Sequence, residues 1–140
     1  MHTKMEAVNA LRTLRGFIGK SQRAALATGC RGEEKQFFFD KLVEMAGIVS
    51  SMPQTYEQDG LGDQAVVYLH YFRGNQDWWI MEKDSGTSGE PGQHQAFGLA
   101  DLGYGGELGY ISIVELLTYE IELDLYLRPR TLAKLHRTPS

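Results

Sequence analysis

The side chains that could act as acids, bases, nucleophiles or metal ligands are few and scattered along this chain. His2 and His136 lie near the two ends of the chain. His70 lies inside an apolar run, and His94 lies within a polar stretch. No pair has the spacing of a metal site or of a base in a catalytic motif. The single cysteine, Cys30, has no identifiable base beside it. The sequence therefore predicts no catalytic residue, no metal site and no enzymatic activity, and we expect His70 to be a packed strand histidine.

A cluster of glycines is the second candidate for chemistry. It surrounds one tyrosine and one glutamate and consists of Gly103, Gly105, Gly106 and Gly109. A phosphate-binding loop needs a following Lys and Ser or Thr at fixed spacing, and a dinucleotide-binding loop needs its own six-residue glycine pattern. Neither pattern is present, so we expect these glycines to form turns, and we predict no cofactor.

Carboxylates are the most abundant functional groups, and they are distributed unevenly. The chain has 140 residues and a net charge of −4. Residues 1–52 carry eight Lys and Arg against five Asp and Glu, whereas residues 53–140 carry six against thirteen. Because a duplex-binding domain presents concentrated Lys and Arg to phosphates, the acidic part is a poor DNA reader. It suits a basic protein surface, including one that normally holds nucleic acid; alternatively, these carboxylates only maintain solubility.

The basic part of the chain has the pattern of three helices, over about residues 3–18, 21–28 and 33–51. Thr3 and Glu6 form a capping box, and Ser21 is positioned to cap the second helix. Apolar stripes at helical spacing follow in the first and third helices: Val8, Leu11, Leu14 and Ile18, then Phe38, Leu42, Met45 and Val49. We expect the third-helix stripe to face the core.

From residue 64 onward, β-branched and aromatic residues favour strands, over about residues 64–73, 77–84, 95–102, 109–111 and 121–128. The first two strands are expected to form a hairpin, in which Trp78 and Trp79 point to opposite faces. Ser112 and Glu115 form a second capping box that starts a short helix over residues 113–119. The last strand alternates apolar residues with mostly acidic ones, which predicts one buried and one wet face.

These elements predict an α+β fold in a single domain spanning residues 1–140. We expect a helical subdomain over 1–52, packed on an acidic, β-rich subdomain over 53–140 with a mainly antiparallel sheet of four to five strands, and a flexible loop over 84–94. No apolar run approaches the roughly 20 residues that span a bilayer, and the N-terminus lacks an apolar signal segment. We therefore expect a cytoplasmic protein with no membrane contact.

One part of the chain resembles a known group of proteins. The run FGLADLGYGGELGYISIVELL, followed by ELDLYLRPRTL and preceded by the tryptophan-bearing strand over 77–84, resembles a family of unknown function encoded on plasmids, integrative elements and phages. The resemblance covers about residues 64–135 and leaves residues 1–52 uncovered. It implies a mobile-element protein, similar in style to anti-CRISPR and anti-restriction proteins, which in many cases act by occupying a nucleoprotein complex without catalysis. The step to those proteins is an analogy.

Two hypotheses follow. In the first, the protein is a non-enzymatic inhibitor that blocks a host-defence complex, such as a CRISPR effector or a restriction enzyme, through partner-binding residues Glu107, Glu115, Glu122, Asp124 and Trp79. In the second, it is a nucleic-acid-binding regulator or conjugation accessory factor that uses Arg12, Arg15, Lys20 and Arg23, although the short, alanine-rich second helix makes direct nucleic-acid binding a weaker expectation. The sequence leaves both a monomer and a homodimer open, and an amphipathic helical extension makes a homodimer reasonable.

Overall fold

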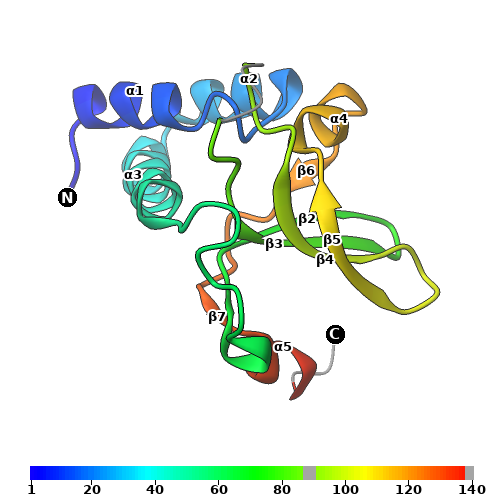
Figure 1. Ribbon diagram of the computed structural model, residues 1–140. Coiled ribbons are helices and arrows are strands. Elements are labelled where there is room, and N and C mark those ends of the chain that lie inside the picture. The colour runs from blue at the N-terminus through cyan, green and yellow to red at the C-terminus, as the bar shows by residue number, and fades with distance from the viewer. Residues whose placement is uncertain (87–90, 138–140) are drawn as a thin grey trace.

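The computed structural model describes residues 1–86 and 91–137, so part of the loop expected over 84–94 lies outside the described residues. The fold is α+β, as predicted (Figure 1). The elements are α1 (Lys4–Thr13), α2 (Lys20–Gly29), α3 (Lys35–Ser51), the 3₁₀ turn η1 (Gly62–Gln64), β1 (Val66–Val67), β2 (Leu69–Arg73), β3 (Gln76–Glu82), β4 (Ala96–Asp101), β5 (Gly106–Ile111), α4 (Ile113–Thr118), β6 (Glu122–Leu123), β7 (Arg130–Thr131) and α5 (Leu132–Arg137).

The main sheet has five antiparallel strands in the order β5-β4-β3-β2-β6. The predicted hairpin joins β2 to β3, and Arg73 pairs with Gln76 across a tight turn at Gly74, whose φ is +57°. A positive φ is a conformation that glycine adopts without steric cost. A separate two-stranded sheet pairs β1 with β7 beside η1 and α5.

One face of the main sheet packs against α1, α2 and α3, which form a layer together in Figure 1. The core between them includes the third-helix residues Leu42, Met45 and Val49, which are buried as expected. Tyr71 on β2 is fully buried there and donates a hydrogen bond from its hydroxyl to the carbonyl of Phe17 at 2.5 Å. Burial raises the pKa of the Tyr71 hydroxyl, because the charged form is disfavoured away from water. This core joins residues from 1–52 and from 53–140 in one cluster.

The helix boundaries differ from the sequence prediction in three places. The first helix ends at Thr13 and not near residue 18, and its buried face holds Ala7, Ala10 and Leu14, while Val8 remains 36 % exposed. The second helix begins at Lys20 with Gly19 as its N-cap, so Ser21 lies inside the first turn and does not cap it. The third helix begins at Lys35, two residues later than predicted. The capping box at the start of α1 is confirmed.

The strand boundaries also differ. The strand expected over 64–73 divides at Tyr68, because β1 leaves the main sheet to pair with β7. The strand expected over 109–111 begins earlier, at Gly106, so Gly106 and Gly109 belong to a strand and not to a turn. The strand expected over 121–128 is only β6, because the Asp124 carboxylate accepts a hydrogen bond from the amide of Tyr126 at 2.8 Å and turns the chain. Ile121, Leu123 and Leu127 are buried as the alternation predicts, whereas Leu125 is only half-buried.

A second, smaller core lies on the other face of the sheet, at the end covered by η1, β7 and α5. Its buried residues are Ala65, Val67, Met81, Leu99, Leu127, Leu132 and Leu135, with Trp79 packed against it. Trp78 packs against the larger core, so the two tryptophans point to opposite faces, as predicted. None of the described helices combines the length and the apolar character needed to cross a membrane.

Candidate partner-binding surface

We call the face of the main sheet opposite α1, α2 and α3 the open face. Most of the unusual contacts between polar side chains lie on it. Tyr71 points into the helix-covered core, so its neighbours His70 and Phe72 point to the open face. Trp79 pairs with His70 in the strand register, and Glu122 pairs with Phe72. Side chains from three neighbouring strands therefore meet on this face.

His70 lies at the centre of the open face between two carboxylates. Its Nε2 is 2.7 Å from Asp77 Oδ1, and its Nδ1 is 3.2 Å from Asp124 Oδ2. The ring stacks on Trp79 with a centroid distance of 5.0 Å and an interplanar angle of 8°, and the side chain is only 16 % exposed. A protonated imidazole can donate to both carboxylates, whereas the neutral ring carries a single N–H and can donate to only one.

These contacts give His70 partners that sequence reasoning did not identify. Asp77 could have been found from the hairpin: a two-residue turn after Arg73 sets the register that places Asp77 diagonally across from His70 on the same face. The contact with Asp124 depends on β6 returning to the edge of the sheet from α4, which no local pattern indicates. Because both ring nitrogens are engaged, the arrangement serves to hold β2, β3 and the end of β6 together and to fix the Trp79 ring.

The structure separates the five residues that the sequence suggested for partner binding. Trp79, Glu122 and Asp124 share the open face, with Glu122 exposed and Asp124 held by His70. Glu107 pairs with Ala100, which contacts the helix-covered core, so Glu107 lies on the opposite face of β5. Glu115 is exposed on α4, outside the sheet.

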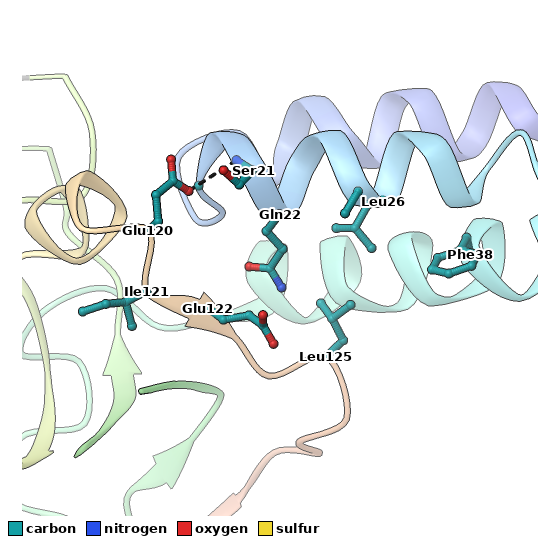
Figure 2. Close-up of a pocket in the computed structure, with 10 residues that line it drawn as sticks. Ser21, Gln22, Leu26, Phe38, Glu120, Ile121, Glu122 and Leu125 are labelled. Atoms are coloured by element: carbon teal, nitrogen blue, oxygen red, sulfur yellow. Dashed lines mark hydrogen bonds between the residues drawn. The ribbon is translucent and has the colours of Figure 1, made fainter. Parts of the chain in front are cut away.

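A groove of about 400 Å³ runs between α2, α3 and the β6 edge, next to the open face (Figure 2). Its lining combines apolar side chains with Glu120 and Glu122. Gln22 crosses from α2 and forms two hydrogen bonds with the backbone of Leu123: its amide nitrogen donates to the carbonyl at 2.8 Å, and its amide oxygen accepts from the N–H at 3.0 Å. This pairing replaces a neighbouring strand, so it closes the β6 edge of the sheet.

Glu120 sits at the end of this groove and has two roles. Its backbone has a φ of +56° and ends α4: the amides of Glu120 and Ile121 donate to the carbonyls of Leu117 and Leu116, which is a Schellman motif. Its carboxylate accepts a hydrogen bond from the amide of Ser21 at 3.3 Å, in the first turn of α2, as the dashed line in Figure 2 shows. Since Gly19 offers no side-chain cap, Glu120 caps α2 from another element.

Three of the four basic residues suggested for nucleic-acid contact lie around one hollow. Arg15, Lys20 and Arg23 line a second groove of about 470 Å³, whose opposite wall includes Val114 and Thr118 of α4. Arg12 is exposed in the last turn of α1 and is not part of this lining. Within residues 1–86 and 91–137, the side chains of Arg15, Lys20 and Arg23 form no ion pair. Their charges are therefore available to an anionic ligand.

Among the carboxylates of the acidic part that the structure describes, two are buried and organise loops. A bulge after Ile80 on β3 turns Glu82 inward, where its carboxylate accepts hydrogen bonds from the amides of Tyr56 and Gln58 at 2.6 and 3.2 Å. Asp84 is 6 % exposed, and hydrogen bonds from the amides of Gly86, Gln95 and His94 lower the pKa of its carboxyl. These two carboxylates do not contribute to the acidic surface.

The residues described here contain no group of three or more His, Cys, Asp or Glu side chains arranged to hold a metal ion. Comparison of the chain with protein-family models, with curated proteins and with solved structures finds no match. Function is therefore inferred from the geometry of the open face and of the two grooves beside it.

Proposed function

We propose that this protein is a non-enzymatic binding protein that docks a basic protein surface on its open face. One observation carries the proposal: Trp79 on β3 and Glu122 and Asp124 at β6 come from two distant segments and share the sheet face opposite α1, α2 and α3, beside the second core. Tryptophans dominate binding energy where they are fixed and become desolvated on binding. Carboxylates beside such an anchor favour basic partners and speed their association.

The His70 cluster supports this proposal, because it orders the site before any partner arrives. The stack of His70 on Trp79 holds the indole in one orientation, and the two bonds to Asp77 and Asp124 hold the imidazole. A side chain that is already ordered loses less conformational entropy on binding than a mobile one. Less of the free energy gained from the contact is therefore offset by the ordering of the Trp79 and His70 side chains.

The resemblance to mobile-element proteins suggests the partner: a cytoplasmic host-defence complex whose basic surface normally holds nucleic acid, such as a CRISPR effector or a restriction enzyme. In this role the protein is an accessory inhibitor that acts by occupancy. The test is inhibition of DNA cleavage by a panel of purified CRISPR effectors and restriction enzymes. We expect loss of cleavage by one of them at an inhibitor ratio near one to one, weakening as salt is raised. Full cleavage by every complex at a large excess of protein would reject the proposal.

A second function is favoured by the groove lined by Arg15, Lys20 and Arg23, which form no ion pair in the part of the chain that the structure describes. Three unpaired cations around one hollow suit a nucleic-acid backbone, and each neutralised phosphate makes binding more dependent on salt. The second candidate is thus a nucleic-acid-binding regulator. A mobility-shift assay with duplex and single-stranded DNA tests it: Arg15→Glu and Arg23→Glu should abolish any shift, Arg12→Glu should reduce it less, and absence of a shift with wild type eliminates it.

A further inference from the structure

The two edges of the main sheet are treated differently. The β6 edge is two residues long, and Gln22 bonds to the Leu123 backbone along it. The β5 edge is six residues long, and among the residues that the structure describes β4 is its only strand neighbour. Edge strands with unpaired N–H and C=O groups are templates for pairing with another chain unless they are short, charged or covered. The β5 edge is long and carries a single charged residue, Glu107.

The side chains of β5 on the open face are apolar and exposed. Leu108 is 55 % exposed, and Tyr110 is 57 % exposed although its ring contacts Tyr56 and Phe97. On the other face β5 presents Glu107 and Gly109, and a Cβ added to Gly109 would meet no atom within 4 Å. Within residues 1–86 and 91–137, the strand therefore offers a backbone edge that no other strand pairs with, together with two apolar side chains on one face.

We propose that β5 pairs antiparallel with β5 of a second copy of this chain, which joins the two sheets across a twofold axis. A twofold axis perpendicular to the sheet keeps the open faces of both copies on the same side, so each residue must face a partner residue of the same parity. A residue must therefore lie on the axis, and the two central residues of β5, Leu108 and Gly109, are the ones that give the longest pairing of the six-residue strand. These two registers differ in what they place opposite Glu107 and Tyr110.

The geometry points to the register centred on Gly109. In that register, Leu108 lies opposite the partner's Tyr110, twice by symmetry, so both exposed apolar residues gain a cross-strand neighbour. Glu107 lies opposite the partner's Ile111, and the two Glu107 residues are about 14 Å apart at the usual rise per strand residue. Centring on Leu108 would bring them to about 8 Å, close to the screening length at physiological salt, so their repulsion would be only partly screened. Gly109 adds no side chain at the axis.

This dimer is independent of the proposed function. Trp79 and Glu122 lie on β3 and β6, and β4 separates β3 from β5 in the sheet. Variants at Leu108 and Tyr110 should therefore change the oligomeric state while Trp79, Glu122 and Asp124 remain in place. Variants at Trp79 should weaken partner binding and leave the oligomeric state unchanged.

The first test is sedimentation velocity of the full chain between about 1 and 100 µM. We expect wild type to sediment as a dimer at the upper concentrations. Leu108→Glu and Tyr110→Lys should each weaken it by removing the apolar cross-strand pair. Mixed in equal amounts, these two variants should again form a dimer, because the introduced carboxylate of one copy then faces the introduced ammonium group of the other, while the remaining Tyr110 still faces the remaining Leu108. A monomeric wild type at 100 µM, or no recovery on mixing two folded variants, would overturn the proposal.

The second test reads the register and does not require a disruptive substitution. In a Cys30→Ser background, Gly109→Cys places two thiols opposite each other at the axis, where the Cα separation of paired strand residues falls within the range for a disulfide. Mild oxidation should give a covalent dimer. Glu107→Cys in the same background is the matched control and should remain uncrosslinked, because its two copies are too far apart. Equal crosslinking at both positions, or none at Gly109→Cys, would contradict the register.

Discussion

Glu120 Oε2 accepts a hydrogen bond from the amide of Ser21, which makes a residue at the end of α4 the cap of α2, 99 positions away in sequence. The same residue holds a φ of +56°, a conformation in which glycine or asparagine is usual at a helix end. A side chain in this region costs about 1–2 kcal/mol relative to glycine. The sequence therefore retains a carboxylate where the backbone alone would favour glycine.

Substitutions at Glu120 should separate the cap from the backbone strain. We expect Glu120→Ala to lower the free energy of unfolding by about 1 kcal/mol through loss of the cap. Glu120→Gly should cost less, because it loses the cap but relieves the positive φ. Glu120→Gln, which keeps an acceptor, should stay near wild type. Urea denaturation measures all three, and an alanine variant as stable as wild type would show that the cap is unimportant.

Gly19 provides a control for this interpretation. A Cβ on Gly19 would approach Glu120 Oε2 to 2.8 Å and displace the carboxylate from Ser21. Gly19→Ala should therefore destabilise wild type but have little effect in the Glu120→Ala background. Equal effects in both backgrounds would mean that the two residues do not interact.

The His70 cluster should be measurable as coupling between residues. His70→Ala leaves two half-buried carboxylates without their shared imidazole partner, and we expect it to destabilise the protein by about 2 kcal/mol and to shift the emission of Trp79. Asp77→Asn should restore part of that loss in the His70→Ala background, although it destabilises wild type. Glu122→Gln, on the same face, is the control and should leave stability unchanged. Additive effects of His70→Ala and Asp77→Asn would contradict the contact.

Sequence reasoning reached the class of fold because the local patterns were consistent with it. The capping box at Thr3, the buried stripe through Leu42 and Met45, and the hairpin after Arg73 all depend on residues close together in sequence, and each is present. The opposed directions of Trp78 and Trp79 follow from the same local rule.

The features that sequence reasoning missed depend on distant partners. The residues around Gly19 and Ser21 do not indicate that Glu120 caps α2. The alternation through residues 121–128 likewise does not indicate that Asp124 turns the chain and bonds to His70. Burial of Glu82 depends on a bulge that follows the pair between Ile80 and Gly98, where the neighbouring strand passes too close for a side chain on Gly98. The composition of the acidic part therefore overstated its surface charge.

Gly98 and Gly109 lie opposite each other on β4 and β5 and should tolerate substitution very differently. A Cβ on Gly98 would lie 2.0 Å from the carbonyl oxygen of Trp79, whereas one on Gly109 would meet no atom within 4 Å. Gly98→Ala should cost about 3 kcal/mol or prevent folding, since the clash is with backbone. Gly109→Ala should leave thermal stability close to wild type. Similar melting temperatures for the two variants would contradict the close approach of β3 and β4.

Asp84 should make stability depend on pH in the acid range. Because hydrogen bonds from Gly86, Gln95 and His94 lower its pKa below the ordinary 3.8, the folded state binds this proton less readily than the unfolded state. Its contribution is fully present above about pH 4 and is lost as pH falls through the folded pKa. Asp84→Asn should remove that part of the acid dependence and cost about 1–3 kcal/mol at pH 7, because an amide nitrogen would face N–H donors.

Urea denaturation at pH 7 and at several values below pH 4 tests this expectation. Asp63→Asn, at an exposed aspartate in η1, is the matched control and should leave stability at pH 7 unchanged. If Asp84→Asn shows the same acid dependence as wild type, the Asp84 carboxylate does not hold the loop ends as described.

The most direct test of the open face as a binding surface is the affinity of four proteins for the purified CRISPR effectors and restriction enzymes of the panel. Wild type, Trp79→Ala, Glu122→Lys and the control Glu33→Lys, whose carboxylate is exposed between α2 and α3, are titrated by biolayer interferometry at low and physiological salt. We predict that wild type binds one complex and that Trp79→Ala weakens this binding at least about tenfold. Glu122→Lys should weaken binding most at low salt, and Glu33→Lys should bind as wild type does. Binding of wild type to none of the complexes, or equal binding by all four proteins, would contradict the account.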